Sequence, residues 1–185
     1  SAEMPWGIGL IENTNPLLGE VPGIIGVKTG MLSTVGYNFI AAQQADALGR
    51  EVINISVTLA RPTKYDRADS GREMLGLMAG MPQQLEIVAD GEEIGSVTTL
   101  TGERVPLVTT AGASAVLLPG ETATRTVRLL GVEPGPAGSP AGTVVVSTPT
   151  GDLEVPVVTA AEIAEPDLRW RLSNPGRLFW GGDRG

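Results

Sequence analysis

The sequence has 185 residues, enough for one ordinary domain or two small ones, and a formal net charge of −8. An acidic chain lacks the concentrated basic surface that binds nucleic acid, which argues against that partner. The absence of Cys and His excludes disulfides, thiolate chemistry, His-ligated metal sites and Ser-His-Asp catalysis, so neither a metal nor a cofactor is expected.

The high content of Gly and Pro, 25 and 14 residues, favours many short strands and turns over a helical bundle. Three apolar stretches, at residues 24–28, 37–42 and 51–59, predict strands, and short connections predict an antiparallel meander. Leu17 and Leu18, just before them, are expected in the core. In the third stretch apolar and polar residues alternate, and the apolar face carries Ile53, Ile55, Val57 and Leu59.

A helix is expected after the meander. Thr63 and Asp66 have the spacing of a capping box at its start, and Gly80 and then Pro82 mark its end. An apolar stripe at helical spacing lies between these limits and predicts the buried face; it comprises Ala68, Leu75 and Met78, with Met74 and Leu77 beside them.

Beyond Pro82 the sequence changes to short β-like stretches separated by Gly and Pro turn signals, which predicts a small β-sandwich. This part carries no constellation of reactive residues, so we expect it to position something rather than to catalyse. The predicted strands lie at residues 85–89, 94–100, 105–109, 115–118, 124–130, 143–147 and 153–158.

The tail from residue 165 to 185 mixes cations with large apolar groups: Arg169, Trp170, Phe179 and Trp180 are its main examples. One interpretation is an interfacial segment on anionic lipid. The other is a chain end whose tryptophans pack back on the sandwich. Pro175 and Gly176 interrupt a continuous amphipathic helix and weaken the membrane interpretation.

The candidate site is the run Lys28, Thr29, Gly30 and Met31 at the end of an apolar strand. If it lines a cleft, a substrate peptide can add as an extra strand along residues 27–31. Lys28 then supplies a fixed positive charge near the nucleophile. Thr29 offers a hydroxyl to a terminal carboxylate, Gly30 leaves room for the substrate, and the Met31 N–H is one oxyanion donor. By composition alone, such a triplet arises by chance in roughly a few per cent of chains this long.

The surroundings of the triplet make it more specific. Residues 15–18, then 25–30, then 35–42 resemble, in that order, the serine-type D-alanyl-D-alanine carboxypeptidases, the low-molecular-mass penicillin-binding proteins. The likeness continues through residues 51–59, the helix at Arg72, Glu73, Met74 and Leu75, and a closing strand at 153–158. It covers residues from about 13 to about 160.

The resemblance implies roles for individual residues. Lys28, Thr29 and Gly30 match the third motif of that family, Lys-Thr-Gly, and Met31 falls at its oxyanion N–H. Arg67 matches an arginine that binds the terminal carboxylate of the substrate, a role that suits a guanidinium group. The alternative for Arg67 is a solvated helix charge near two aspartates, Asp66 and Asp69.

Two departures from the family pattern are equally informative. Met31 stands where a small, hydroxyl-bearing or aromatic residue is usual. The first two motifs, Ser-x-x-Lys and Ser-x-Asn, do not occur in the sequence, so the nucleophile is expected on polypeptide upstream of Ser1. This chain alone should not hydrolyse anything.

The resemblance therefore implies an α+β fold: the C-terminal strands and helix of a penicillin-binding or β-lactamase-like transpeptidase domain at residues 1–81, and a β-sandwich at 82–164 before the tail. The leading hypothesis is the C-terminal portion of a secreted, cell-envelope D-alanyl-D-alanine carboxypeptidase acting by acyl-serine chemistry. Its expected partners are the N-terminal portion with Ser-x-x-Lys and Ser-x-Asn, the peptidoglycan stem peptide and β-lactams.

Two other hypotheses remain open. One is a non-catalytic envelope module that keeps the fold for binding or scaffolding, and the other is an unrelated all-β binding protein with a chance triplet. A partial sheet of three strands leaves the face of Ile53 to Leu59 with too little to pack against. We therefore predict tight association with a partner chain, or aggregation of this chain alone.

Overall fold

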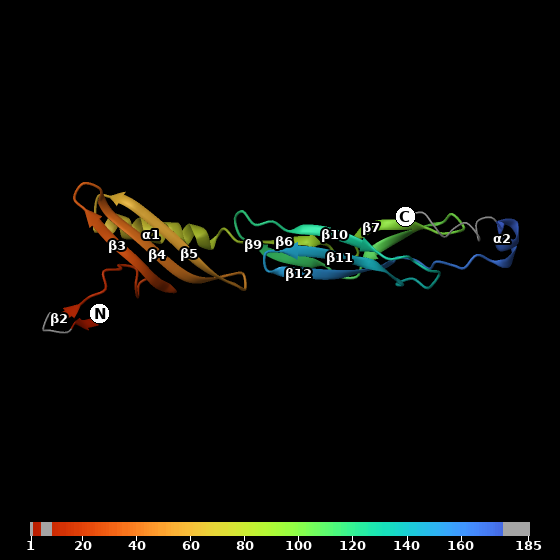
Figure 1. Cartoon of the computed structure of the whole chain (residues 1–185), viewed down its shortest axis with the longest axis horizontal. Helices are drawn as coiled ribbons and strands as arrows, with labels where there is room; N and C mark the ends of the chain where they lie inside the picture. Colours follow the sequence, from red (N-terminus) through yellow and green to blue (C-terminus); the bar gives the residue numbers. More distant parts are fainter. Residues whose placement is uncertain (1, 5–8, 176–185) are drawn as a thin grey trace. The chain divides into compact units, whose positions relative to one another are not determined.

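The computed structural model describes residues 2–4 and 9–175, and the chain divides into two compact units, Ser1–Gln83 and Gln84–Gly185 (Figure 1). The first unit contains a short hairpin of β1 and β2, a three-stranded sheet and one long helix. Its elements are β1 (Ala2–Met4), β2 (Gly9–Ile11), β3 (Ile24–Leu32), β4 (Gly36–Ala47), β5 (Arg50–Arg61) and α1 (Lys64–Ala79).

The three-stranded sheet has the order β3-β4-β5, and both pairs are antiparallel, which confirms the predicted meander. Each strand is longer than the apolar stretch that predicted it, because polar residues continue the ladder beyond the core. The register places Lys28 opposite Ile40, which is in turn opposite Val57. Thr29 lies opposite Phe39, so Lys28 and Thr29 point to opposite faces of the sheet.

Helix α1 covers one face of this sheet. Phe39 on β4 and Leu75 on α1 are buried together with Leu17, which belongs to the entry segment, residues 13–23, before β3. Gly71 allows the close approach, because a Cβ atom at that position would lie 3.1 Å from the Phe39 ring. Leu17 is fully buried as expected, whereas Leu18 is exposed.

The ends of α1 are those that the sequence predicts. The Thr63 side chain accepts from the backbone of Asp66, and the Asp66 carboxylate accepts from the backbone of Thr63, which completes a capping box; Gly80 is the C-cap. The buried face contains Ala68, Gly71 and Leu75. Leu77 is exposed, since two residues beyond Leu75 a helical side chain points away from the buried face.

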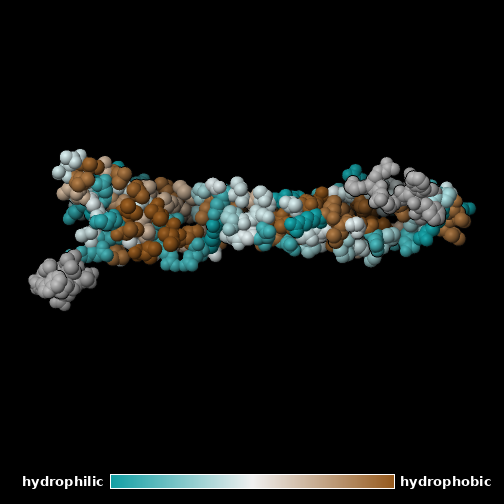
Figure 2. Space-filling view, in the orientation of Figure 1, coloured by the Kyte–Doolittle hydropathy of each residue, from teal (hydrophilic) through white to brown (hydrophobic). Residues whose placement is uncertain are grey.

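The other face of the sheet is apolar and open. Ile53, Ile55, Val57 and Leu59 on β5 are 60%, 56%, 48% and 64% exposed. Figure 2 shows hydrophobic residues gathered over the sheet of this unit. Helix α1 packs on the opposite face, so within the described part of the first unit no helix covers these side chains, as expected for a partial sheet. A chain of this kind is not all-β, so the all-β hypothesis is wrong: the 16-residue helix α1 supplies Ala68 and Leu75 to the first core.

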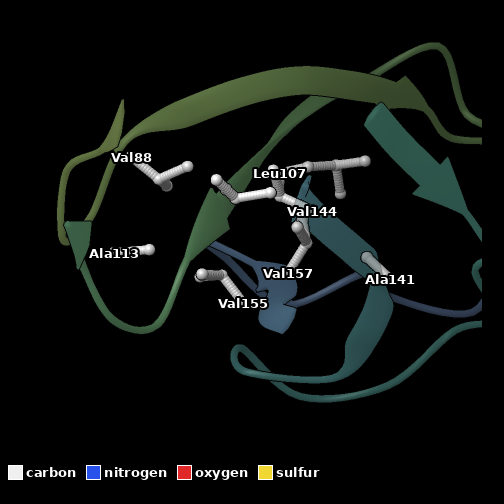
Figure 3. Close-up of a cluster of buried hydrophobic side chains, with 8 residues drawn as sticks. Val88, Leu107, Ala113, Ala141, Val144, Val155 and Val157 are labelled. Carbon is white, nitrogen blue, oxygen red and sulfur yellow. The ribbon is translucent and has the colours of Figure 1, made fainter. Parts of the chain in front are cut away.

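The second unit is a β-sandwich, as predicted. A five-stranded sheet of order β10-β11-β12-β8-β7 faces the two-stranded sheet β6-β9. Figure 3 shows side chains from both sheets converging on one core, with Val88 from β6, Leu107 from β8 and Val144 from β11. All seven predicted strands are present: β6 (Gln83–Val88), β7 (Glu93–Thr98), β8 (Arg104–Thr109), β9 (Ala113–Leu117), β10 (Thr124–Leu129), β11 (Pro140–Thr148) and β12 (Gly151–Thr159).

After the sandwich comes a short helix, α2 (Leu168–Ser173), capped by Asp167. Its Trp170 is half-buried, while Leu168 and Leu172 are exposed. Phe179 and Trp180, the other residues of the predicted lipid contact, lie outside the described residues, so that contact stays a prediction. No helix in residues 2–4 and 9–175 is long and apolar enough to cross a bilayer.

Candidate functional site

The candidate site lies on β3, which is an edge strand of the three-stranded sheet. Its inner side pairs with β4, and no described strand pairs with its outer side. The unpaired side of an edge strand presents N–H and C=O groups that a further extended segment can bind. Peptide addition along residues 27–31 stays a prediction that this free edge allows.

Lys28 is exposed and lies on the open apolar face, in register with Ile40 and Val57. Its Nζ atom donates a 2.7 Å hydrogen bond to the carbonyl oxygen of Thr29. The ammonium group is thus held at the strand instead of extending freely into solvent. Any group that covers the apolar face from outside would meet this positive charge at its edge.

Thr29 has a hydroxyl partner from this chain. Its Oγ1 lies 2.6 Å from Oγ1 of Thr14, which belongs to the entry segment before β3. Thr14 is exposed and Thr29 half-buried, so the pair sits at the surface. The Thr29 hydroxyl is therefore oriented by a neighbour before any ligand arrives.

Gly30 leaves open space. A Cβ atom built there would meet nothing within 4 Å, and the φ angle of Gly30 lies outside the left-handed region. The fold of this chain thus makes no demand for glycine at position 30. A side chain there would instead occupy space beside the outer edge of β3.

Arg67, on the first turn of α1, lies beneath the same strand. Its Nη1 atom donates to the carbonyl oxygens of Gly30, at 3.1 Å, and Asn38, at 3.3 Å. The guanidinium carbon is 5.5 Å from the centre of the Tyr37 ring, close enough for a cation–π contact.

The expectation of a solvated helix charge is wrong for Arg67, because the residue is only 8% exposed and is bound to the sheet. Asp69 pairs with Arg72 instead. The Nε atom of Arg67 is buried and has no hydrogen-bond partner. Binding of a substrate carboxylate by Arg67 stays a prediction.

Met31 pairs with Tyr37, and its side chain is 57% exposed. The structure thus brings Lys28, Thr29, Gly30 and Met31 together with Arg67 around one end of β3. The oxyanion role of the Met31 N–H stays a prediction. In the part of the chain that the structure describes, no three acidic side chains come together as metal ligands would.

Thr14 and Asn38 are neighbours of the site that the sequence alone does not reveal. The residues Asn13, Thr14, Asn15 and Pro16 carry a clear turn signal, but the turn alone does not tell where the Thr14 hydroxyl points. Asn38 contributes through its carbonyl oxygen to Arg67 and through Oδ1, which accepts from the backbone N–H of Ala60. A backbone role of this kind leaves no signal in a sequence.

Comparison with known proteins finds a likeness in structure alone: no family model matches the chain, and no curated protein matches it. The chain is similar to penicillin binding protein 5 from Haemophilus influenzae, with 21% identity and a TM-score of 0.38, over 83% of this chain and 46% of that one. A D-alanyl-D-alanine carboxypeptidase, DacD from Francisella tularensis, gives 16% identity and a TM-score of 0.39, over 82% and 39%.

A third similar structure is a peptidoglycan synthesis regulatory factor, PBP3 from Streptococcus pneumoniae, with 17% identity and a TM-score of 0.37. That match covers 83% of this chain and 47% of the other. The chain spans less than half the length of each of these three proteins.

Proposed function

We propose that this chain is the C-terminal portion of a serine-type D-alanyl-D-alanine carboxypeptidase of the cell envelope, with its nucleophile on polypeptide outside these 185 residues. The observation that carries the proposal is the place of Lys28. The only lysine of the three-stranded sheet lies on the free edge strand and points to the open apolar face. A second polypeptide that covers this face would place its own side chains next to the Lys28 ammonium group.

The reaction would follow an acyl-serine route. The stem peptide adds along the outer edge of β3, and the serine oxygen attacks the carbonyl carbon of the last peptide bond. The C–N bond breaks, terminal D-Ala leaves as the amine with the proton given up by the serine, and water then hydrolyses the acyl-serine. Lys28 stabilises negative charge that develops near the nucleophile. Thr29 donates its hydroxyl to the terminal carboxylate, the Met31 N–H is one oxyanion donor, and Arg67 adds positive charge behind Gly30.

The missing wall of the site would be the N-terminal portion that carries Ser-x-x-Lys and Ser-x-Asn. The open apolar face of the sheet supports a covering partner, because monomeric proteins rarely expose a continuous apolar patch of this kind. This face comprises Ile53, Ile55, Val57 and Leu59. Burial of such side chains contributes roughly 1.5–3 kcal/mol each. The same partner would thus complete the core and bring the serine to Lys28.

The test is covalent labelling by a fluorescent penicillin. The N-terminal portion, expressed from the sequence that precedes this chain, should take up the label when it is mixed or co-expressed with this chain. Lys28→Ala should abolish that labelling. A properly folded complex that takes up no label would contradict the proposal.

The second candidate is a non-catalytic envelope module that binds or scaffolds. Met31 favours it, because the family that the sequence resembles usually has a small, hydroxyl-bearing or aromatic residue at this position and this chain has an exposed methionine. This candidate predicts that Lys28→Ala leaves binding of the chain to isolated cell walls unchanged, which a pull-down with peptidoglycan sacculi would measure.

A further inference from the structure

The Thr14–Thr29 pair lies at the outer edge of the candidate site. The two Oγ1 atoms are 2.6 Å apart, although the residues are 15 positions apart in the sequence. Thr14 is not on the sheet: it belongs to the entry segment, residues 13–23, that precedes β3. The contact is therefore made by tertiary structure and not by neighbours on one strand.

The backbone at Thr14 lies within a side-chain turn and leads directly into a second one. Oδ1 of Asn13 accepts from the N–H of Asn15, so Thr14 is the central residue of an Asx turn, and Oδ1 of Asn15 accepts from the N–H of Leu17 in a second turn that follows. Leu17 is fully buried. Farther along, Glu20 accepts a 2.9 Å hydrogen bond from Arg72 of α1.

These turns fix where the Thr14 hydroxyl can reach. Three residues before a fully buried leucine, and inside a side-chain turn, the backbone of Thr14 has little freedom. A short contact made from such a position persists without a ligand. Thr14 is itself exposed, so the turn that encloses it is what favours this contact over a contact with water.

We propose that Thr14 is a positioning residue that aligns the Thr29 hydroxyl toward the terminal carboxylate of the substrate. The inference rests on the proposed function. Each hydroxyl has one proton and can accept two hydrogen bonds. When Thr14 donates to Thr29, the Thr29 proton is free to point outward, and the bond from Thr14 makes Thr29 a better donor.

The contribution should appear only when the ligand carries a carboxylate. A hydrogen bond to a charged group is stronger than one between neutral groups, so the alignment of Thr29 matters most for an anionic acceptor. A peptide whose C-terminus is a carboxamide gains little from an aligned Thr29 proton. This difference separates positioning of a site residue from a general effect on the fold.

The experiment uses the complex of this chain with its N-terminal portion and two peptides that end in D-Ala-D-Ala, one with a free carboxylate and one with a terminal carboxamide. For Thr14→Val, which keeps the shape and removes the hydroxyl, KM for the carboxylate peptide should rise about three- to tenfold, since that is the range for loss of one hydrogen bond. kcat should change little, and the carboxamide peptide should show almost no effect.

Thr14→Ser keeps the hydroxyl and is the matched control, so KM for the carboxylate peptide should stay close to that of the unmodified complex. Equal changes for the two peptides, or no change in Thr14→Val, would overturn the inference. The proposed function fails in a different way, because then the unmodified complex itself would cleave neither peptide and take up no penicillin.

Discussion

Arg67 of α1 donates a 3.1 Å hydrogen bond to the carbonyl oxygen of Gly30, so the helix holds the strand that carries the candidate site from behind. The same Nη1 atom reaches the carbonyl oxygen of Asn38, and the Tyr37 ring lies beside the guanidinium. The position of β3 at Gly30 thus depends on Arg67, which approaches the sheet from the face opposite to Lys28.

Arg67→Lys should lower the free energy of unfolding by about 1–3 kcal/mol, which is the cost of leaving buried polar groups without partners. A lysine ammonium does not have the planar fork and ring contact of arginine, and the two hydrogen bonds from Arg67 to the carbonyl oxygens of Gly30 and Asn38 would be lost. Urea denaturation at one fixed protein concentration measures the change. Arg61→Lys, at an exposed position, is the control; equal stability of the two variants would contradict the prediction.

Gly71→Ala and Gly76→Ala should differ although both replace a glycine within α1. At position 76 a new Cβ meets nothing, so the higher helix propensity of alanine should stabilise the chain by roughly up to 1 kcal/mol. At position 71 it would lie 3.1 Å from two atoms of the Phe39 ring, and such overpacking costs about 1–3 kcal/mol. The thermal midpoint should therefore rise for Gly76→Ala and fall relative to it for Gly71→Ala, and the reverse order would be inconsistent with this packing.

The chain without its partner should associate through the open face of the sheet. Replacing Ile55 and Val57 by threonine removes exposed apolar surface but keeps residues with a β preference. The double variant should elute as a smaller species than the unmodified chain in size-exclusion chromatography with light scattering. The matched control replaces Leu168 and Leu172 of α2, which are also exposed, and should leave the association unchanged. A monodisperse monomer for the unmodified chain would refute the prediction.

Glu92 should make the β-sandwich less stable as the pH falls below the ordinary pKa of a glutamate. Arg125 donates to the Glu92 carboxylate at 2.7 Å, and this hydrogen bond, with that from the Ala89 N–H, holds the pKa of Glu92 below its ordinary value. A lowered folded pKa means that the stabilisation is present above the ordinary value of 4.5 and is lost as the pH falls through the lowered pKa.

The measurement is the thermal midpoint of the chain along an acid titration below a pH of about 4.5. Glu92→Gln should flatten the fall in that midpoint, because the ion pair no longer titrates. Glu93→Gln is the control from the neighbouring exposed residue. An unchanged acid dependence in Glu92→Gln would show that other carboxylates set it.

Local patterns predicted much of the fold. Three of these patterns depend only on neighbours in the sequence. They are the capping box of Thr63 and Asp66, the period of two in β5, and the glycine turns at Gly91 and Gly102, where φ is positive. The structure confirmed these elements because each is stabilised by residues close to it. The strands were predicted too short, because the polar residues at the ends of β4 and β5 carry little periodic signal.

The tertiary contacts of the site were beyond sequence reasoning. The match of Lys28, Thr29 and Gly30 to a motif does not tell that Thr14 would meet Thr29, or that Arg67 would be buried instead of solvated. Such contacts depend on the packing of Leu17 and Phe39, which brings distant segments together. Periodicity reports which face of an element is apolar, but not which polar group from another element reaches it.

The central claim is that Lys28 belongs to an active site completed by another polypeptide. The most direct measurement compares the rate of fluorescent-penicillin labelling of the N-terminal portion in complex with unmodified chain, with Lys28→Ala and with Lys64→Ala, the second lysine of the sequence, which lies on α1 beside Tyr65. We predict that Lys28→Ala abolishes labelling and that Lys64→Ala leaves it unchanged. Labelling at equal rates in all three complexes would contradict the claim.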